Sequence, residues 1–238
     1  MKKLSENACK ILNDRQRILC RDQWFSRMTN LFDGKPDDYN RRYVFTLCGS
    51  VPRPGDDSLA YTNPEEWVTE CLELIAARNE SEANRFAPVC VEYPIYGVHF
   101  IDRMFGADVF FQDGQWNARY LKTPVGQLKM PDLEHDETWQ MAVRAAKAFV
   151  EADVKLPLFG LPTLSSALNI MINLYGDEAL VSILVDEEAA LHDLTVINDL
   201  IRMLHRWYLA RCSSFSRLFR GIVRSLPDPV SFAAVPVN

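Results

Sequence analysis

The sequence predicts an α/β fold in which short parallel strands alternate with helices. Three apolar runs bounded by turn residues are predicted to be buried strands, namely Tyr43–Cys48, Pro88–Tyr93 and Leu156–Gly160. Segments with apolar residues at helical spacing lie between and after these runs, and such alternation is typical of βαβ units that build a parallel sheet. A closed (β/α)8 barrel needs eight strands, so the pattern leaves two architectures open: an open α/β sheet or part of a barrel.

The N-terminal region is predicted to be helical over residues 5–32. Ser5 is a suitable N-cap, and apolar residues recur behind it at helical spacing. A second helix is predicted to begin at Asn63, where an asparagine cap is followed by a proline and by two acidic residues in the first turn. That helix is expected to extend to Arg78 and to lead into the second strand.

A short helix and a β-hairpin are predicted to follow the second strand. The helix is expected over Val98–Phe105, because Gly106 comes directly after it. The hairpin strands are Ala107–Gln112 and Trp116–Leu121, which flank Asp113-Gly114, a dipeptide that favours a tight turn. Further helices are predicted at Glu137–Ala152, Pro162–Leu174 and Glu187–Leu209, the first and last with a clear apolar stripe.

Composition and charge indicate a globular cytoplasmic protein. Hydrophobic residues make up 48% of the 238 residues, and the formal net charge of −6 argues against binding to nucleic acid or to an anionic membrane surface. No apolar stretch is long enough to cross a bilayer, and the N-terminus has no signal-peptide pattern. The six cysteines are widely spaced without a C-x-x-C pair, which favours reduced thiols over disulfides.

A series of short motifs occurs along residues 87–208. Tyr93–Val109 combines a strand end, a short helix and a Gly-x-x-Val step; Gln115-Trp116 and Lys122-Thr123-Pro124 accompany the hairpin; Gly160–Leu164 follows the third strand; and Val185–His192 opens the last helix. In this order they resemble the N-terminal half of uroporphyrinogen decarboxylase-like proteins. The resemblance implies an α/β fold that is a partial (β/α)8 barrel with parallel strands, N-terminal helices and a β-hairpin excursion.

The resemblance implies a carboxy-lyase that acts on tetrapyrroles, because porphyrinogen decarboxylases form one main branch of the family. The alternative is the branch of corrinoid-dependent methyltransferases, and a third reading is an inactive fragment that only binds. A tetrapyrrole or corrinoid is the ligand that the first two readings imply, loss of both kinds of binding would favour the third, and no bound cofactor is assigned to these residues. The zinc site of the methyltransferases lies in the C-terminal half, and the four histidines here have no second ligand at metal-site spacing.

Two departures from the family pattern bear on the choice of branch. The arginine-rich signature of the decarboxylases is reduced to Arg53 in the matching stretch, and Ser165-Ser166-Ala167-Leu168 stands where a tyrosine is expected. The family uses those arginines for the carboxylates of its substrate. The departures therefore argue against decarboxylation of uroporphyrinogen itself.

Glu92 and His99 are the candidate catalytic residues. Glu92 is placed at the carboxyl end of a predicted strand, where barrel active sites are built. His99 lies at the start of the next helix and carries a group that transfers protons near neutral pH. A salt-bridged loop acid and a partly buried structural histidine are the corresponding structural interpretations.

Arg53, Thr163 and Ser165 are the candidate substrate-binding residues. Arg53 could grip a carboxylate, although a solvated surface charge is the usual role of such a residue. Thr163 and Ser165 follow the third strand and stand near a predicted helix start, where free N–H groups bind anions. Simple N-capping by hydroxyl groups explains the same positions.

The C-terminal stretch differs in composition from the rest. Residues 210–238 contain four arginines and a single acidic residue, and the strand expected after the last helix is missing from their pattern. We therefore expect residues 1–209 to form the N-terminal half of the barrel, and 210–238 to be an atypical tail that is disordered or out of frame. A half barrel would expose a strand edge, which predicts self-association.

Overall fold

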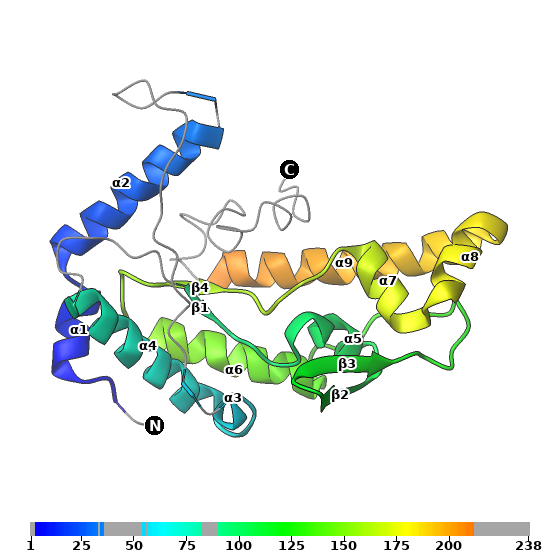
Figure 1. Cartoon of the computed structure of the whole chain (residues 1–238), viewed down its shortest axis with the longest axis horizontal. Coiled ribbons are helices and arrows are strands. Elements are labelled where there is room, and N and C mark those ends of the chain that lie inside the picture. The colour runs from blue at the N-terminus through cyan, green and yellow to red at the C-terminus, as the bar shows by residue number, and fades with distance from the viewer. Residues whose placement is uncertain (1–2, 33, 36–53, 56, 82–89, 212–238) are drawn as a thin grey trace. The chain divides into compact units, whose positions relative to one another are not determined.

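The computed structural model describes residues 3–32, 34–35, 54–55, 57–81 and 90–211 (Figure 1). These residues divide into two compact units. The first comprises the described residues of Met1–Val91 and Ala145–Gly160, and the second those of Glu92–Arg144 and Leu161–Ser213. The predicted strand at 43–48 and the substrate-binding candidate Arg53 lie outside the described residues.

The first unit contains the helices α1 (Glu6–Leu12), α2 (Arg15–Phe32), α3 (Ser58–Thr62) and α4 (Pro64–Ser81). Ser5 caps α1 as predicted, since its Oγ accepts a hydrogen bond from the Ala8 amide at 3.2 Å. The single helix predicted over 5–32 is wrong in one respect, because it is broken before α2. Asp14 causes that break: its carboxylate accepts from the Arg17 amide at 2.9 Å and starts a new helix.

The start of α4 confirms the predicted cap at Asn63. Its side-chain oxygen accepts from the Glu66 amide at 3.2 Å, while its side-chain nitrogen donates to the Glu66 carboxylate at 2.9 Å. The first bond satisfies a backbone N–H that a helix start otherwise leaves without a partner, and the second holds the two side chains together. The short helix α3, which precedes Asn63, is not predicted by the sequence pattern.

Two predicted strands are present in shortened form as β1 (Cys90–Glu92) and β4 (Leu158–Gly160). They are neighbours in one two-stranded sheet, although the hairpin and α6 (Glu137–Glu151) separate them in the sequence. Beside β4, the rings of Phe149 and Phe159 pack 5.0 Å apart. The Leu156 amide donates to the Leu12 carbonyl at 2.8 Å, so α1 is tied to the chain that enters β4.

The second unit begins with a 3-10 turn (Gly97–His99), α5 (Phe100–Met104) and a hairpin of β2 (Asp108–Gln112) and β3 (Gln115–Arg119). The strands pair antiparallel with Phe111 opposite Trp116, which confirms the predicted hairpin. The turn residues Asp113 and Gly114 have φ angles of 53° and 80°, the left-handed conformation that a two-residue hairpin turn requires.

The second unit also contains the helices α7 (Ala167–Tyr175), α8 (Asp177–Val185) and α9 (Glu187–Arg211). α7 begins at Ala167 rather than at Pro162, because Ser166 is the residue that caps it. α8 has no counterpart among the predicted helices. It is separated from α7 by Gly176, whose φ of 63° and ψ of −137° are accessible to glycine and allow a sharp turn. Both helices pack against α9 (Figure 1).

α9 presents an apolar face to this unit. Its buried residues recur at helical spacing: Ala190, Asp193, Ile197, Leu200, Leu204 and Tyr208. Near its end, the Trp139 ring meets the rings of Trp207 and Tyr208 edge to face. Among the described residues no single helix has the length and hydropathy to cross a membrane; α7 and α8 pass that test only as a pair bent by 112°.

Candidate functional site

His99, Asp102 and Asn173 form a polar cluster, which we call the His99 cluster. The Nδ1 atom of His99 lies 2.6 Å from Oδ2 of Asp102, and the Asn173 amide nitrogen donates to the same oxygen at 2.9 Å. The Asp102 side chain is fully buried and the His99 side chain is 13% exposed. The cluster therefore combines a buried carboxylate with an imidazole that solvent or a ligand can reach.

The turn before His99 is held in an uncommon conformation. Tyr96 and Gly97 have φ angles of 57° and 53°, which is unfavourable for the tyrosine. Trp116 of the hairpin packs on this turn: its ring meets Tyr96 edge to face at 5.2 Å, and a Cβ on Gly97 would come within 3.3 Å of it. The hairpin thus stabilises the turn that brings His99 to Asp102.

The electrostatics of Asp102 set the chemistry of the cluster. Burial raises the pKa of its carboxyl, and the hydrogen bonds from His99 and Asn173 oppose this shift without cancelling it. Its other oxygen, Oδ1, is buried and has no hydrogen-bond partner among the described residues. A carboxyl that is costly to ionise beside an imidazole can share a proton with that ring, so the pair is suited to proton transfer.

Of the other predicted site residues, the structure describes the side chains of Thr163 and Ser165. Glu92 is the last residue of β1, but its side chain lies outside the described part of the structure. Thr163 and Ser165 lie half-buried in the segment between β4 and α7, and neither caps the helix. Asp102 and Asn173 are not predicted by any motif. The spacing of His99 and Asp102 by one helical turn is a signal that could have indicated the first of them.

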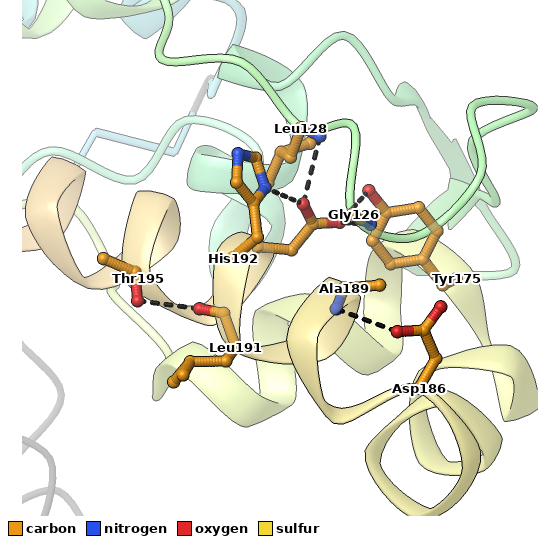
Figure 2. A network of polar contacts seen from close by, with 9 residues as sticks. Gly126, Leu128, Tyr175, Asp186, Ala189, Leu191, His192 and Thr195 are labelled. Atoms are coloured by element: carbon orange, nitrogen blue, oxygen red, sulfur yellow. Dashed lines mark hydrogen bonds and ion pairs between the residues drawn. The ribbon is translucent and has the colours of Figure 1, made fainter.

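A second cluster surrounds Asp193 of α9, and we call it the Asp193 cluster (Figure 2). Its Oδ2 atom accepts from the Gly126 amide at 2.9 Å and from the Tyr175 hydroxyl at 2.7 Å. Its Oδ1 atom accepts from the Leu128 amide at 3.0 Å and contacts Nδ1 of His192 at 2.8 Å. The carboxylate therefore ties the segment before α6 and the end of α7 to α9.

The hydrogen bonds of the Asp193 cluster keep its carboxylate charged. Burial raises the pKa of Asp193, but the hydrogen bonds from Tyr175, His192 and the two backbone amides outweigh it and leave the pKa below its usual value. Burial and the adjacent carboxylate raise the pKa of Tyr175, so its hydroxyl stays protonated and remains a donor. Both oxygens of the Asp193 carboxylate thus have hydrogen-bond donors from the protein itself.

A pocket of about 600 Å³ lies beside the Asp193 cluster. Its lining consists of Phe105, Leu121, Thr123, Gly126, Gln127, Leu128, Lys129 and His192. All of these belong to the second unit, so the pocket is contained within it. Its volume is in the range of small-molecule sites, about 300–1,000 Å³.

The described residues do not provide a metal site. No group of three or more His, Cys, Asp or Glu side chains among them is arranged to hold a metal ion. The histidines of both clusters contact a carboxylate through Nδ1. The zinc chemistry of corrinoid methyltransferases therefore has no matching ligand set in this part of the chain.

Comparisons with known proteins give one distant similarity in structure. No family model and no curated protein match the sequence. The structure is similar to a methyltransferase from Methanosarcina mazei, with a TM-score of 0.49 and 17% sequence identity over 75% of this chain. The match covers 53% of that methyltransferase, so this chain spans about half its length. A similarity of this extent does not define the family or the activity of this chain.

Proposed function

We propose that the chain is a uroporphyrinogen decarboxylase-like protein that binds a corrinoid and belongs to the methyltransferase branch. In this proposal β1 and β4 are two parallel strands of a partial (β/α)8 barrel. The observation that carries it is the position of the His99 cluster, directly after a strand that neighbours β4 in the sheet. Residues that follow the carboxyl ends of barrel strands build the active sites of such folds.

The choice of branch depends on the residues that would bind the carboxylates of a porphyrinogen substrate. A porphyrinogen decarboxylase grips several carboxylates and needs clustered arginines for this purpose. Only Arg53 stands in the matching stretch of this chain. A corrinoid carries neutral amide side arms instead, which hydroxyl and amide groups can bind, and this favours the methyltransferase branch over decarboxylation.

In this proposal Nε2 of His99 forms a hydrogen bond with an amide side arm of the bound ligand, while Asp102 holds Nδ1 and orients the ring. Glu92 supplies a second acid at the strand end. Thr163 and Ser165 contact polar side arms of the ligand. No metal-dependent step is assigned to these residues, since the described part of the chain offers no ligand set for one.

Absorbance titration of the full chain with hydroxocobalamin, and separately with coproporphyrin, tests this proposal. We expect a saturable shift of the cobalamin bands, with tighter binding of the corrinoid than of the porphyrin. His99→Gln should weaken cobalamin binding by about tenfold, the effect of losing one hydrogen bond. Tighter binding of coproporphyrin would instead support the decarboxylase branch.

His135 provides a matched control for His99. Its Nδ1 atom also contacts an aspartate three residues away, Asp132, at 2.8 Å, but its side chain is 81% exposed. His135→Gln should therefore leave the affinity for cobalamin unchanged. Equal losses in both variants, or no saturable change with either tetrapyrrole in the wild type, would refute the proposed function.

A further inference from the structure

The pocket beside the Asp193 cluster is lined by basic, neutral polar and apolar residues. Its polar groups are the side chains of Thr123, Gln127, Lys129 and His192, and no lining residue is acidic. Within the described part of the chain, the ammonium group of Lys129 makes no hydrogen bond or ion pair with another residue. The lining therefore offers the Lys129 cation and several donors, and the adjacent Asp193 carboxylate contacts His192 rather than Lys129.

Asp193 shapes this pocket without adding its own charge to the lining. It accepts from the amides of Gly126 and Leu128, which fixes the backbone of the pocket wall, and all its strong acceptor positions have donors. It also holds the His192 ring through Nδ1. Figure 2 shows the other ring nitrogen pointing away from Asp193. Among the described residues that nitrogen, Nε2, has no hydrogen-bond partner.

We propose that this pocket binds a small organic molecule with one carboxylate on an apolar body. Lys129 contacts one carboxylate oxygen with a charged donor. When both ring nitrogens of His192 carry a proton, its Nε2 donates to the other oxygen. The side chains of Phe105, Leu121 and Leu128 form the apolar wall for the body of the ligand. An apolar pocket with few convergent polar groups is typical of small-molecule sites.

A carboxylate fits the donors of this pocket better than a phosphate does. Phosphate sites are commonly built from several backbone N–H groups that converge on the anion. Two amides of the pocket wall, those of Gly126 and Leu128, already donate to Asp193. The lining supplies one ammonium group, that of Lys129, and one imidazole, that of His192, which match the two oxygens of a carboxylate.

Calorimetric titration of the full chain with naphthoate, naphthamide and naphthyl phosphate tests this site. We expect naphthoate to bind at least about tenfold more tightly than its neutral amide, and more tightly than the phosphate. Lys129→Gln should remove the preference for naphthoate over naphthamide. Lys122→Gln is the matched control, since Lys122 is exposed on the same segment but does not line the pocket, and it should retain the preference.

An NMR spectrum of the imidazole nitrogens gives a second readout that does not depend on affinity. Naphthoate should shift the His192 ring signals, and His192→Gln should weaken naphthoate binding although the variant remains folded. Equal affinity for naphthoate and naphthamide, tighter binding of the phosphate, or no saturable binding would overturn the proposal. Naphthoate is not a tetrapyrrole, so these outcomes are separate from those of the cobalamin titration.

Discussion

Asp102 and Asp193 are two fully buried carboxyl groups whose pKa values are shifted in opposite directions. Each contacts Nδ1 of a histidine, at 2.6 Å and 2.8 Å respectively. Asp193 has four donors among the described residues, and its pKa is lowered although burial raises it. Asp102 has two donors among the described residues, His99 and Asn173, both on one oxygen, and burial raises its pKa. At Asp193 the donors outweigh the effect of burial on the pKa, and at Asp102 they do not.

This difference separates a structural role from a chemical one. A carboxylate with all its acceptor positions filled stabilises the fold and has little capacity left to exchange protons. A carboxyl with an unsatisfied buried oxygen is energetically costly, and such groups are concentrated at functional sites. The Asp193 cluster thus organises the second unit, while the His99 cluster is the one suited to proton transfer.

The largest effect that we predict is on the free energy of unfolding, which the same substitution, aspartate to asparagine, should change differently at Asp193 and at Asp102. Asp193→Asn should lower the free energy of unfolding by about 3 kcal/mol, because it places an amide among four donors and removes a buried charge that they stabilise. Asp102→Asn should lower it by less than about 1 kcal/mol, because the charge that it removes is poorly compensated. Urea denaturation at neutral pH measures both, and similar losses would remove the contrast.

A smaller effect is expected at Gly126, whose backbone donates to Asp193. Its φ is +89°, and an added Cβ would lie 2.7 Å from the Cβ of Ala189. Gly126→Ala should therefore cost about 2 kcal/mol of stability. Gly106 has a φ of +87° with open space around it, so Gly106→Ala is the control for backbone strain alone. The melting temperatures should differ, and equal values would show that the segment moves freely away from α9.

The Tyr175 hydroxyl is expected to contribute less. Tyr175→Phe removes one of the four donors to Asp193 and should cost about 1 kcal/mol, the usual net value of a hydrogen bond. Tyr120→Phe serves as the control, since that side chain is 65% exposed. Thermal unfolding of both variants checks the prediction. An equal change in the two would mean that the Asp193 cluster does not depend on this hydroxyl.

The smallest effect is in the pH dependence of stability. The Asp193 carboxylate contributes stability above its unfolded pKa of about 3.8, and this contribution should be lost as pH falls through its lower folded value. Asp102 has the opposite sign: its raised folded pKa lowers stability as pH rises above about 3.8. The free energy of unfolding is measured between acidic and neutral pH for the wild type and for the two asparagine variants. The difference between the wild type and each variant should change with pH in opposite directions for Asp193→Asn and Asp102→Asn. Changes in the same direction would contradict the assigned pKa shifts.

The features that depend on near neighbours could be predicted from the sequence. The caps at Ser5 and Asn63 and the turn at Asp113-Gly114 each involve residues within one helical turn or one hairpin, and the structure confirms them. α8 could not be predicted in the same way, because a glycine such as Gly176 is compatible both with the end of a helix and with a turn between two helices.

The clusters are harder to predict, because their contacts join distant parts of the chain. Asp193 binds Tyr175 across 18 positions and Leu128 across 65, so neither motif nor periodicity links them. His99 is indicated by its place after a strand, and its partner Asp102 is local. Asn173, in contrast, reaches Asp102 across 71 positions and has no local signal.

The most direct measurement is an NMR titration of the side-chain carboxyl carbons of Asp102 and Asp193 in the full chain, with each asparagine variant used to assign one signal. We predict that Asp193 titrates below the ordinary aspartate value of 3.8 and Asp102 above it. The reverse order, or a shared midpoint at the ordinary value, would contradict the opposite pKa shifts that burial and hydrogen-bond donors give these two groups.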